Sequence, residues 1–119
     1  MNPQLEILLQ IQDLKAQRKE LQEVDAAAKV QEEEFNLRIE EATAQLDAKI
    51  EDVVEELDPT VRARYRRLDR GLDRVVVPAI NGICYGCFVA VATAVATDPD
   101  EKKKLQNCAH CGRFLYFVD

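Results

Sequence analysis

A long stretch without helix-breaking residues limits the folds open to this chain. Neither Gly nor Pro occurs from Gln4 to Leu57. Gly and Pro are the strongest breakers of regular structure, so their absence predicts one helix over about residues 3–57. At roughly 1.5 Å per residue such a helix would be some 80 Å long, which is more than a small globular domain can bury. We therefore expect the helix to project as an arm.

Three dipeptides mark helix starts. In each, a short polar side chain can accept hydrogen bonds from the first turn, and the following Pro has a helical φ where no donor is needed. They are Asn2-Pro3, Asp58-Pro59 and Asp98-Pro99. The second predicts a short helix over about residues 59–70, because Gly71 is a natural stop. The third predicts another short helix, in which Glu101 would complete a capping box.

Apolar residues repeat every seven positions along the predicted arm. This repeat is typical of a coiled-coil seam, which is not stable on one isolated helix, so we expect self-association, as in a dimer. The alternative is a hairpin whose tip lies at residues 25–34, although no turn residue occurs there. The first series is Leu14, Leu21, Ala28, Phe35 and Ala42, and the second is Ile39, Leu46 and Val53.

Charge is distributed unevenly along the chain. Residues 1–58 carry 6 Lys and Arg against 16 Asp and Glu, whereas residues 59–119 carry 10 against 6. A basic segment can bind nucleic acid through phosphates, but its arginines can also pair with the acidic arm, and both interpretations stay open. The candidate binding residues are Arg62, Arg66, Arg67, Arg70, Lys102, Lys103, Lys104 and Arg113.

A strand is predicted after the second helix. The segment RVVVPAI is rich in β-branched residues and leads to the turn pair Asn81-Gly82. Pro78 has no N–H to donate, so it predicts that this strand lies at the edge of its sheet.

All four cysteines lie in two identical pairs near the C-terminus, with the pattern C-x2-C-x20-C-x2-C. The pairs are Cys84 with Cys87, and Cys108 with Cys111. This spacing is that of a four-thiolate zinc ribbon, and it predicts one zinc ion per chain. Gly86 and Gly112 are expected where the turns need a permissive φ. A redox-active dithiol is expected within a βαβ framework, and it would not explain why there are two cysteine pairs.

Several classes of function are disfavoured. His110 is expected to be a surface residue, because four thiolates already complete the metal's coordination and leave no position for water. Motifs for phosphate-binding loops, dinucleotides or nucleophilic catalysis do not occur, so we expect neither an enzyme nor a small-molecule substrate. The longest apolar run is also too short to span a membrane, and no signal peptide is visible. We expect a cytoplasmic protein, where thiols stay reduced and disulfides are disfavoured.

The segments YRRL, GICYGC and CAHCGRFLY resemble bacterial C4-type zinc-ribbon proteins that carry a coiled-coil arm before the ribbon. The resemblance covers about residues 57–116. It implies a non-enzymatic adaptor, since relatives contact the alternative sigma factor of RNA polymerase, flagellar messenger RNA or type III secretion components. Relatives are usually longer and have a two-helix hairpin arm, and they often show Leu-Pro after the second cysteine, where this chain has Phe88-Val89.

The expected architecture is therefore mainly α-helical. Residues 1–74 are predicted to form the coiled-coil arm and residues 75–119 a small β zinc ribbon. The expected function is an adaptor that contacts nucleic acid or the transcription machinery through the ribbon and the Arg-rich helix. The alternative is a protein-binding scaffold or chaperone that uses the apolar seam of the arm.

Overall fold

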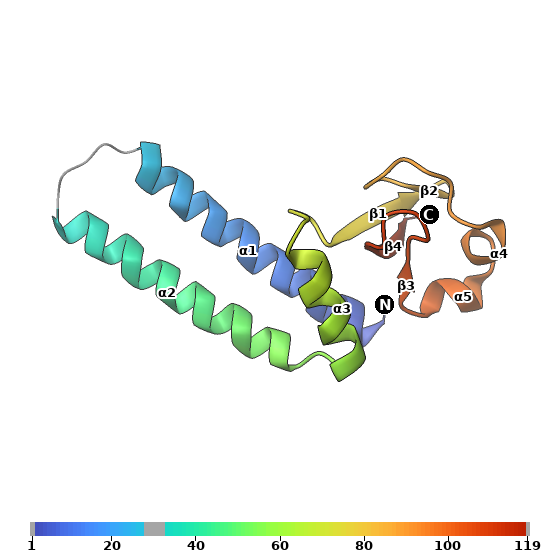
Figure 1. The fold of residues 1–119 in the computed structure, drawn as a ribbon, viewed down its shortest axis with the longest axis horizontal. Coiled ribbons are helices and arrows are strands. Elements are labelled where there is room, and N and C mark those ends of the chain that lie inside the picture. The colour runs from blue at the N-terminus through green and yellow to red at the C-terminus, as the bar shows by residue number, and fades with distance from the viewer. Residues whose placement is uncertain (1, 28–32, 119) are drawn as a thin grey trace.

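The computed structural model describes residues 2–27 and 33–118. The side chains of residues 25–36 also lie outside the described part of the chain. The molecule is elongated, with dimensions of 56 × 27 × 23 Å. A helical arm occupies one end and a small sheet with two short helices the other (Figure 1). The helices are α1 (Pro3–Ala27), α2 (Glu33–Glu55), α3 (Pro59–Asp69), α4 (Thr93–Ala96) and α5 (Pro99–Lys103). The strands are β1 (Val76–Ile80), β2 (Ile83–Cys84), β3 (Gln106–Asn107) and β4 (Phe114–Val118).

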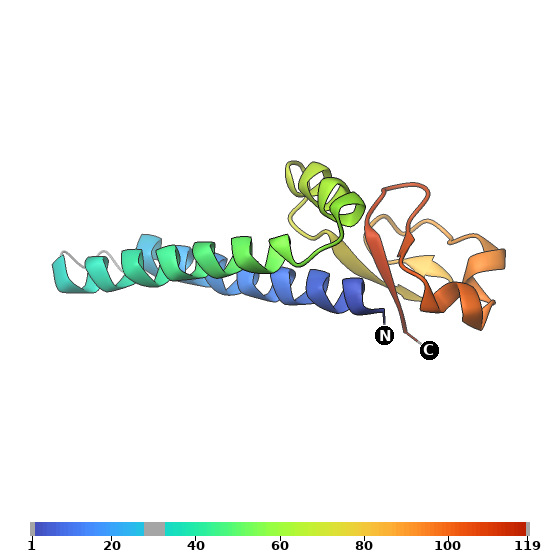
Figure 2. The same cartoon turned by 90° about the horizontal axis from the view of Figure 1, so that it is seen from below.

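The arm consists of two helices, so the prediction of one helix over residues 3–57 is wrong. Helices α1 and α2 run side by side in opposite directions, as the two views show (Figures 1 and 2). An ion pair of 2.7 Å joins Arg18 of α1 to Asp47 of α2. The hairpin alternative gives the correct topology, although the residues between the helices, 28–32, lie outside the described part of the chain.

The hairpin forms because it buries the apolar seam within one chain. Ile11 of α1 and Val53 of α2 are almost fully buried, at 0% and 1% exposure, in the same cluster. In a single long helix both would face water unless a second molecule covered them. Burial between the helices therefore outweighs the lack of a turn residue in the sequence.

The predicted oligomer seam is thus an internal contact. Ile39 and Val53 are buried, and Leu14, Leu21 and Leu46 are half-buried. The side chain of Phe35 and the whole of Ala28 lie outside the described residues. The hairpin covers most of these side chains, so the seam does not need a second molecule to bury it.

The three predicted helix starts are confirmed. Helices α1, α3 and α5 each begin at the expected proline. The side-chain oxygens of Asn2 and Asp98 accept backbone hydrogen bonds of 2.9 Å from Gln4 and Asp100. Asp58 makes no such cap, and its own N–H instead donates to the Gln4 side chain at 2.8 Å. This contact ties the start of α3 to the start of α1.

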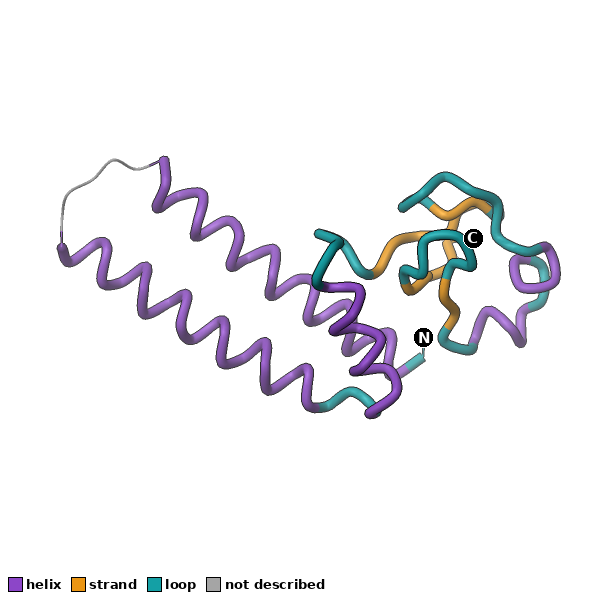
Figure 3. The backbone as a smooth tube through the Cα atoms, in the orientation of Figure 1, coloured by secondary structure: helices purple, strands orange, loops and turns teal. Residues whose placement is uncertain are grey.

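The four strands form one sheet in the order β2-β1-β4-β3, with β1 and β4 parallel. The strands, orange in Figure 3, gather at the end of the molecule away from the arm. Asn81 and Gly82 join β1 to β2 with φ of 53° and 75°, as expected for a tight hairpin turn. The predicted edge position of β1 is wrong, because β1 lies between β2 and β4. Pro78 is tolerated there because β2 is only two residues long: Pro78 accepts a bond from the N–H of Tyr85, beyond the end of β2.

The two faces of the sheet have different partners. Val76 and Phe114 belong to the cluster formed with α1, α2 and α3. Val77 and Leu115, their neighbours along β1 and β4, belong to a second cluster that contains Cys84. Side chains alternate between the faces of a strand, so the sheet separates the base of the arm from the cysteines. The first cluster contains residues from both sides of the predicted domain boundary between residues 74 and 75.

No helix in the described ranges is both long and apolar enough to cross a membrane.

Candidate metal centre and the basic residues around it

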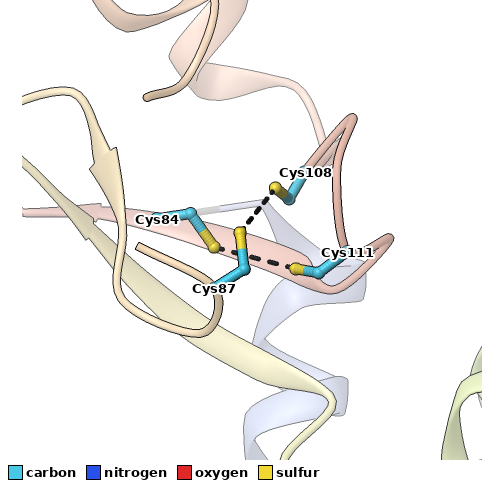
Figure 4. Close-up of side chains that lie close together, drawn as sticks. All are labelled: Cys84, Cys87, Cys108 and Cys111. Atoms are coloured by element: carbon cyan, nitrogen blue, oxygen red, sulfur yellow. Dashed lines mark hydrogen bonds between the residues drawn. The ribbon is translucent and has the colours of Figure 1, made fainter. Parts of the chain in front are cut away.

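The structure brings all four cysteine sulfurs together (Figure 4), and they lie within 4.8 Å of one another. The Sγ atoms of Cys84 and Cys111 are 3.8 Å apart, and those of Cys87 and Cys108 are 3.7 Å apart. Zinc–sulfur bonds of roughly 2.3 Å in a tetrahedron place neighbouring sulfurs about 3.8 Å apart. A disulfide would need roughly 2.05 Å. The spacing therefore fits a tetrahedral metal ion and rules out disulfides in this arrangement.

Each cysteine pair lies on a turn, which we call a knuckle: residues 84–88 form the first and residues 108–112 the second. Each knuckle contains the same kind of backbone hydrogen bond, in which the N–H of its fifth residue donates to the carbonyl of its first residue. These bonds are Phe88 to Cys84 at 2.7 Å and Gly112 to Cys108 at 2.9 Å. In both knuckles the fifth residue has a positive φ, 61° at Phe88 and 80° at Gly112. The first knuckle thus places an aromatic residue where the second has Gly.

The metal-free thiols differ in acidity. Burial is the main cause that raises the pKa of Cys84, and it raises the pKa of Cys87 to about 12. Burial also opposes ionisation of Cys108, but N–H groups of Cys111 and His110 and neighbouring thiols donate to its sulfur and lower its pKa to about 7. The pKa of Cys108 is thus lower than those of Cys84 and Cys87. A bound cation would stabilise the other thiolates as well.

The side chains between the paired cysteines do not complete the site. His110 is exposed, as expected for a residue that is not a metal ligand. The expectation for Gly112 is confirmed, but Gly86 has no positive φ. A Cβ at Gly86 would instead lie 2.8 Å from Cδ and 2.9 Å from Nη1 of Arg113. A side chain at position 86 would therefore displace Arg113, the residue after the second knuckle, from its place against the first knuckle.

Two of the candidate binding arginines are committed to the arm. Arg66 pairs with Glu51 at 2.7 Å and with Glu55 at 3.5 Å. Arg62 pairs with Glu55 at 3.6 Å and donates to the carbonyls of Val54, Glu55 and Leu57 at 3.3, 2.9 and 2.9 Å. The pairing of arginines with the acidic arm, left open by the sequence, therefore holds for these two.

Other arginines of α3 face solvent. Arg64, Arg67 and Arg70, which directly follows α3, are exposed, and across residues 2–27 and 33–118 none of them forms an ion pair. Arg64 and Arg67 line a groove of about 340 Å³ together with Leu68 and Gly112. This groove lies between α3 and the second knuckle, because Leu68 is 3.4 Å from the Cβ position of Gly112.

The lysines form a separate basic group. They belong to α5 and its C-terminal end, at the far side of the ribbon from α3 (Figures 1 and 2). Lys104 pairs with Glu101 at 2.9 Å, and the Lys102 ammonium lies 5.9 Å from the centre of the Phe117 ring. Lys103 is exposed. The eight candidate basic residues therefore do not make one surface.

Sequence reasoning missed an exposed aromatic pair on the first knuckle. Phe88 and Tyr85 are 71% and 44% exposed, and their ring centres are 5.5 Å apart. Comparison of C-Y-G-C-F with C-A-H-C-G would have shown that an aromatic residue replaces the Gly of the second pair.

No protein-family model matches the chain, and neither does any curated protein. Among solved structures, the chain is 32% identical to the CT398 protein of Chlamydia trachomatis, with a TM-score of 0.59 over 80% of this chain and 42% of that one. It is 28% identical to the HP0958 protein of Helicobacter pylori, with a TM-score of 0.62 over 71% of this chain and 36% of that one. The chain thus spans about two-fifths of these bacterial proteins, whose names state no activity.

Proposed function

We propose that this chain is a non-enzymatic adaptor, stabilised by one structural zinc ion, that contacts nucleic acid through phosphate groups. Its binding surface would be the exposed arginines of α3 beside the second knuckle. The proposal joins two separate arguments, one for the metal and one for the phosphates.

Zinc is the metal that the donor set favours. Four thiolates in a tetrahedron form a closed structural site, which leaves no open position for a substrate or an activated water. The sulfur spacings of 3.7 and 3.8 Å support this coordination. The zinc ion would hold the two knuckles together and so fix Gly112 and Arg113 relative to α3. Measurement of the metal content of the purified protein should give one zinc per chain.

The observation that carries the phosphate argument is the difference between neighbouring arginines of α3. Arg66 pairs with two carboxylates of α2, whereas Arg67 borders the groove beside Gly112 and is not part of an ion pair in the described structure. A guanidinium group suits phosphate because it offers several donors in a planar fork. Contacts of this kind position a nucleic acid without reading its sequence.

The scaffold alternative has less support. It assigned recognition to the apolar seam of the arm, but Ile39 and Val53 of that seam are buried inside the hairpin. A partner helix could reach them only after the hairpin opened. The exposed basic groove needs no such rearrangement.

The test compares two arginines of the same helix. Binding of a labelled oligonucleotide to zinc-loaded protein is measured as a function of salt concentration. Arg67→Gln should weaken binding and reduce the salt slope by roughly 0.7 to 0.9, the value for one phosphate. Arg66→Gln is the matched control and should leave the slope unchanged, because the guanidinium group of Arg66 pairs with Glu51 and Glu55 and makes no phosphate contact in this proposal.

Two results would contradict the proposal. The first is wild-type protein that shows no salt-sensitive binding at low ionic strength. The second is equal loss of slope in both variants, which would mean that the groove has no special part in binding.

A further inference from the structure

The first knuckle carries an exposed apolar surface that the metal site does not require. It consists of Tyr85 and Phe88 of the knuckle together with Ile83 and Val89, which flank the knuckle in the chain, and these side chains are 38–71% exposed. We call this the aromatic patch. Its centre is the ring pair of Tyr85 and Phe88. Transfer of Phe, Tyr, Ile and Val side chains out of water is favourable. An exposed apolar patch on a knuckle therefore indicates a binding partner.

The backbone of Phe88 strengthens this argument. Its φ of 61° lies in the left-handed region, which costs roughly 1–2 kcal/mol for a residue with a side chain. The equivalent residue of the second knuckle is Gly112, which has a φ of 80°. Its N–H donates to the carbonyl of Cys108, as the N–H of Phe88 does to the carbonyl of Cys84. Gly would therefore suit the first knuckle better as a structural element. The ring of Phe88 faces water at 71% exposure, so burial does not offset that cost. Strain of this kind is typical of functional positions.

The basic groove borders the second knuckle, and the residue after that knuckle packs against the first. Gly112 lines the groove with Arg64 and Arg67. The next residue, Arg113, places its guanidinium against Gly86, which lies between Tyr85 and Cys87. The Nε of Arg113 donates to the Arg74 carbonyl at 3.0 Å, which holds the side chain in this place. One guanidinium group, that of Arg113, thus packs against the first knuckle at Gly86, the residue next to Tyr85 in the chain.

We propose that the aromatic patch stacks unpaired bases, so that the nucleic acid bound by this chain is single-stranded. Unpaired bases are apolar on their faces and stack on Tyr and Phe, while cationic side chains beside the rings follow the phosphates. The paired bases of a duplex do not expose those faces. A protein partner would use the same apolar side chains but would not need the exposed arginines of the neighbouring groove. The inference rests on the proposed phosphate contacts and adds the class of nucleic acid.

The test uses two changes at one position in zinc-loaded, full-length protein. Phe88→Gly removes the ring and relieves the strained φ, whereas Phe88→Tyr keeps an aromatic ring. Binding to short oligothymidylate and oligouridylate should weaken about 5- to 150-fold in Phe88→Gly, the range for one stacked base, and should stay close to wild type in Phe88→Tyr. The salt slope should not change in either variant, because no phosphate contact is lost.

The thermal unfolding midpoint of Phe88→Gly should equal or exceed that of the wild type. A merely structural role of the ring predicts the opposite, a variant that is less stable. Tyr85→Ala is the second variant and should weaken binding in the same direction, with zinc content unchanged.

An abasic strand of the same length separates this inference from the proposed function. It keeps the phosphates but has no bases, so wild type should bind it about as weakly as Phe88→Gly binds oligothymidylate. Equal binding of both strands by wild type and Phe88→Gly would overturn the stacking inference and leave phosphate binding intact. No salt-sensitive binding of either strand would overturn both. A patch that instead joins two copies of the chain would show in sedimentation as self-association lost in Phe88→Gly, with oligonucleotide binding unaffected, and that result would also overturn the inference.

Discussion

Gln12 joins the arm to the ribbon. It lies in α1, and its side-chain oxygen accepts bonds from the N–H groups of Val75 and Val76 at 3.1 and 3.0 Å. Its side-chain nitrogen donates to the carbonyl of Val76 at 3.0 Å. One side chain therefore satisfies three backbone groups at the start of β1, more than 60 residues away in the chain. Nothing in the heptad pattern of the arm marks this position.

Gln12→Leu should destabilise the protein by roughly 2–4 kcal/mol, because it leaves backbone donors and an acceptor without partners in a half-buried place. Urea unfolding followed by circular dichroism measures the change. Gln17→Leu is the matched control on the same helix, since the hydrogen bond of Gln17 to Asp13 is exposed to solvent, and it should change stability by about 0.5 kcal/mol or less. Similar losses in the two variants would show that the Gln12 bonds are not important.

At the scale of elements, the hairpin of α1 and α2 is held by its seam. Val53 is 1% exposed and lies in the cluster with Leu8 and Ile11 of α1. Leu37, on the same helix as Val53, is 56% exposed. The two positions therefore allow a direct comparison of buried and exposed sites in one helix.

Val53→Asp should unfold the hairpin or cost about 3–5 kcal/mol, because it places a charge in a core without a partner. Leu37→Asp, the control, should change stability by about 0.5 kcal/mol or less. The thermal midpoint of the wild type should not depend on protein concentration, since the seam is satisfied within one chain. A midpoint that rises with concentration would instead favour a dimer.

At the scale of the whole molecule, one hydrophobic cluster joins the arm to the sheet. It contains Leu8 of α1, Val54 of α2, Tyr65 of α3, Val76 of β1 and Phe114 of β4. Lys15 adds an ion pair to Asp69 of α3 and lies 5.3 Å from the centre of the Tyr65 ring. A sheet that loses its order would therefore expose part of the core of the helices.

Removal of zinc should lower the thermal midpoint of the helical signal as well as unfold the ribbon. Structural zinc contributes on the order of 10–16 kcal/mol, and the shared core transmits its loss to the base of the arm. Far-UV circular dichroism of chelated protein and of Cys111→Ser measures this effect. Hydrogen exchange should show lost protection around Tyr65 and Leu8 as well as in β1 and β4. Helices that melt at the same temperature with and without zinc would mean that the arm is independent of the ribbon.

The sequence by itself determined the features that depend on neighbouring residues. Asn2 and Asp98 cap helices through backbone groups two positions away, and Asn81-Gly82 makes its turn within four residues. The spacing of the cysteines also predicted that two short knuckles would bring four thiols together. Such features follow from local geometry, which a short segment carries with it wherever it lies in the fold.

Only the tertiary structure decided the features that depend on distant residues. The heptad pattern of the arm is the same for a dimer and for a hairpin, because both bury the same side chains. The hairpin forms because it provides the partner helix within the chain. Arg66 and Arg67 are adjacent and chemically identical, yet one faces the carboxylates of α2 and the other the groove at Gly112. Their difference arises from where α3 crosses the arm and the second knuckle, and no local pattern records that crossing.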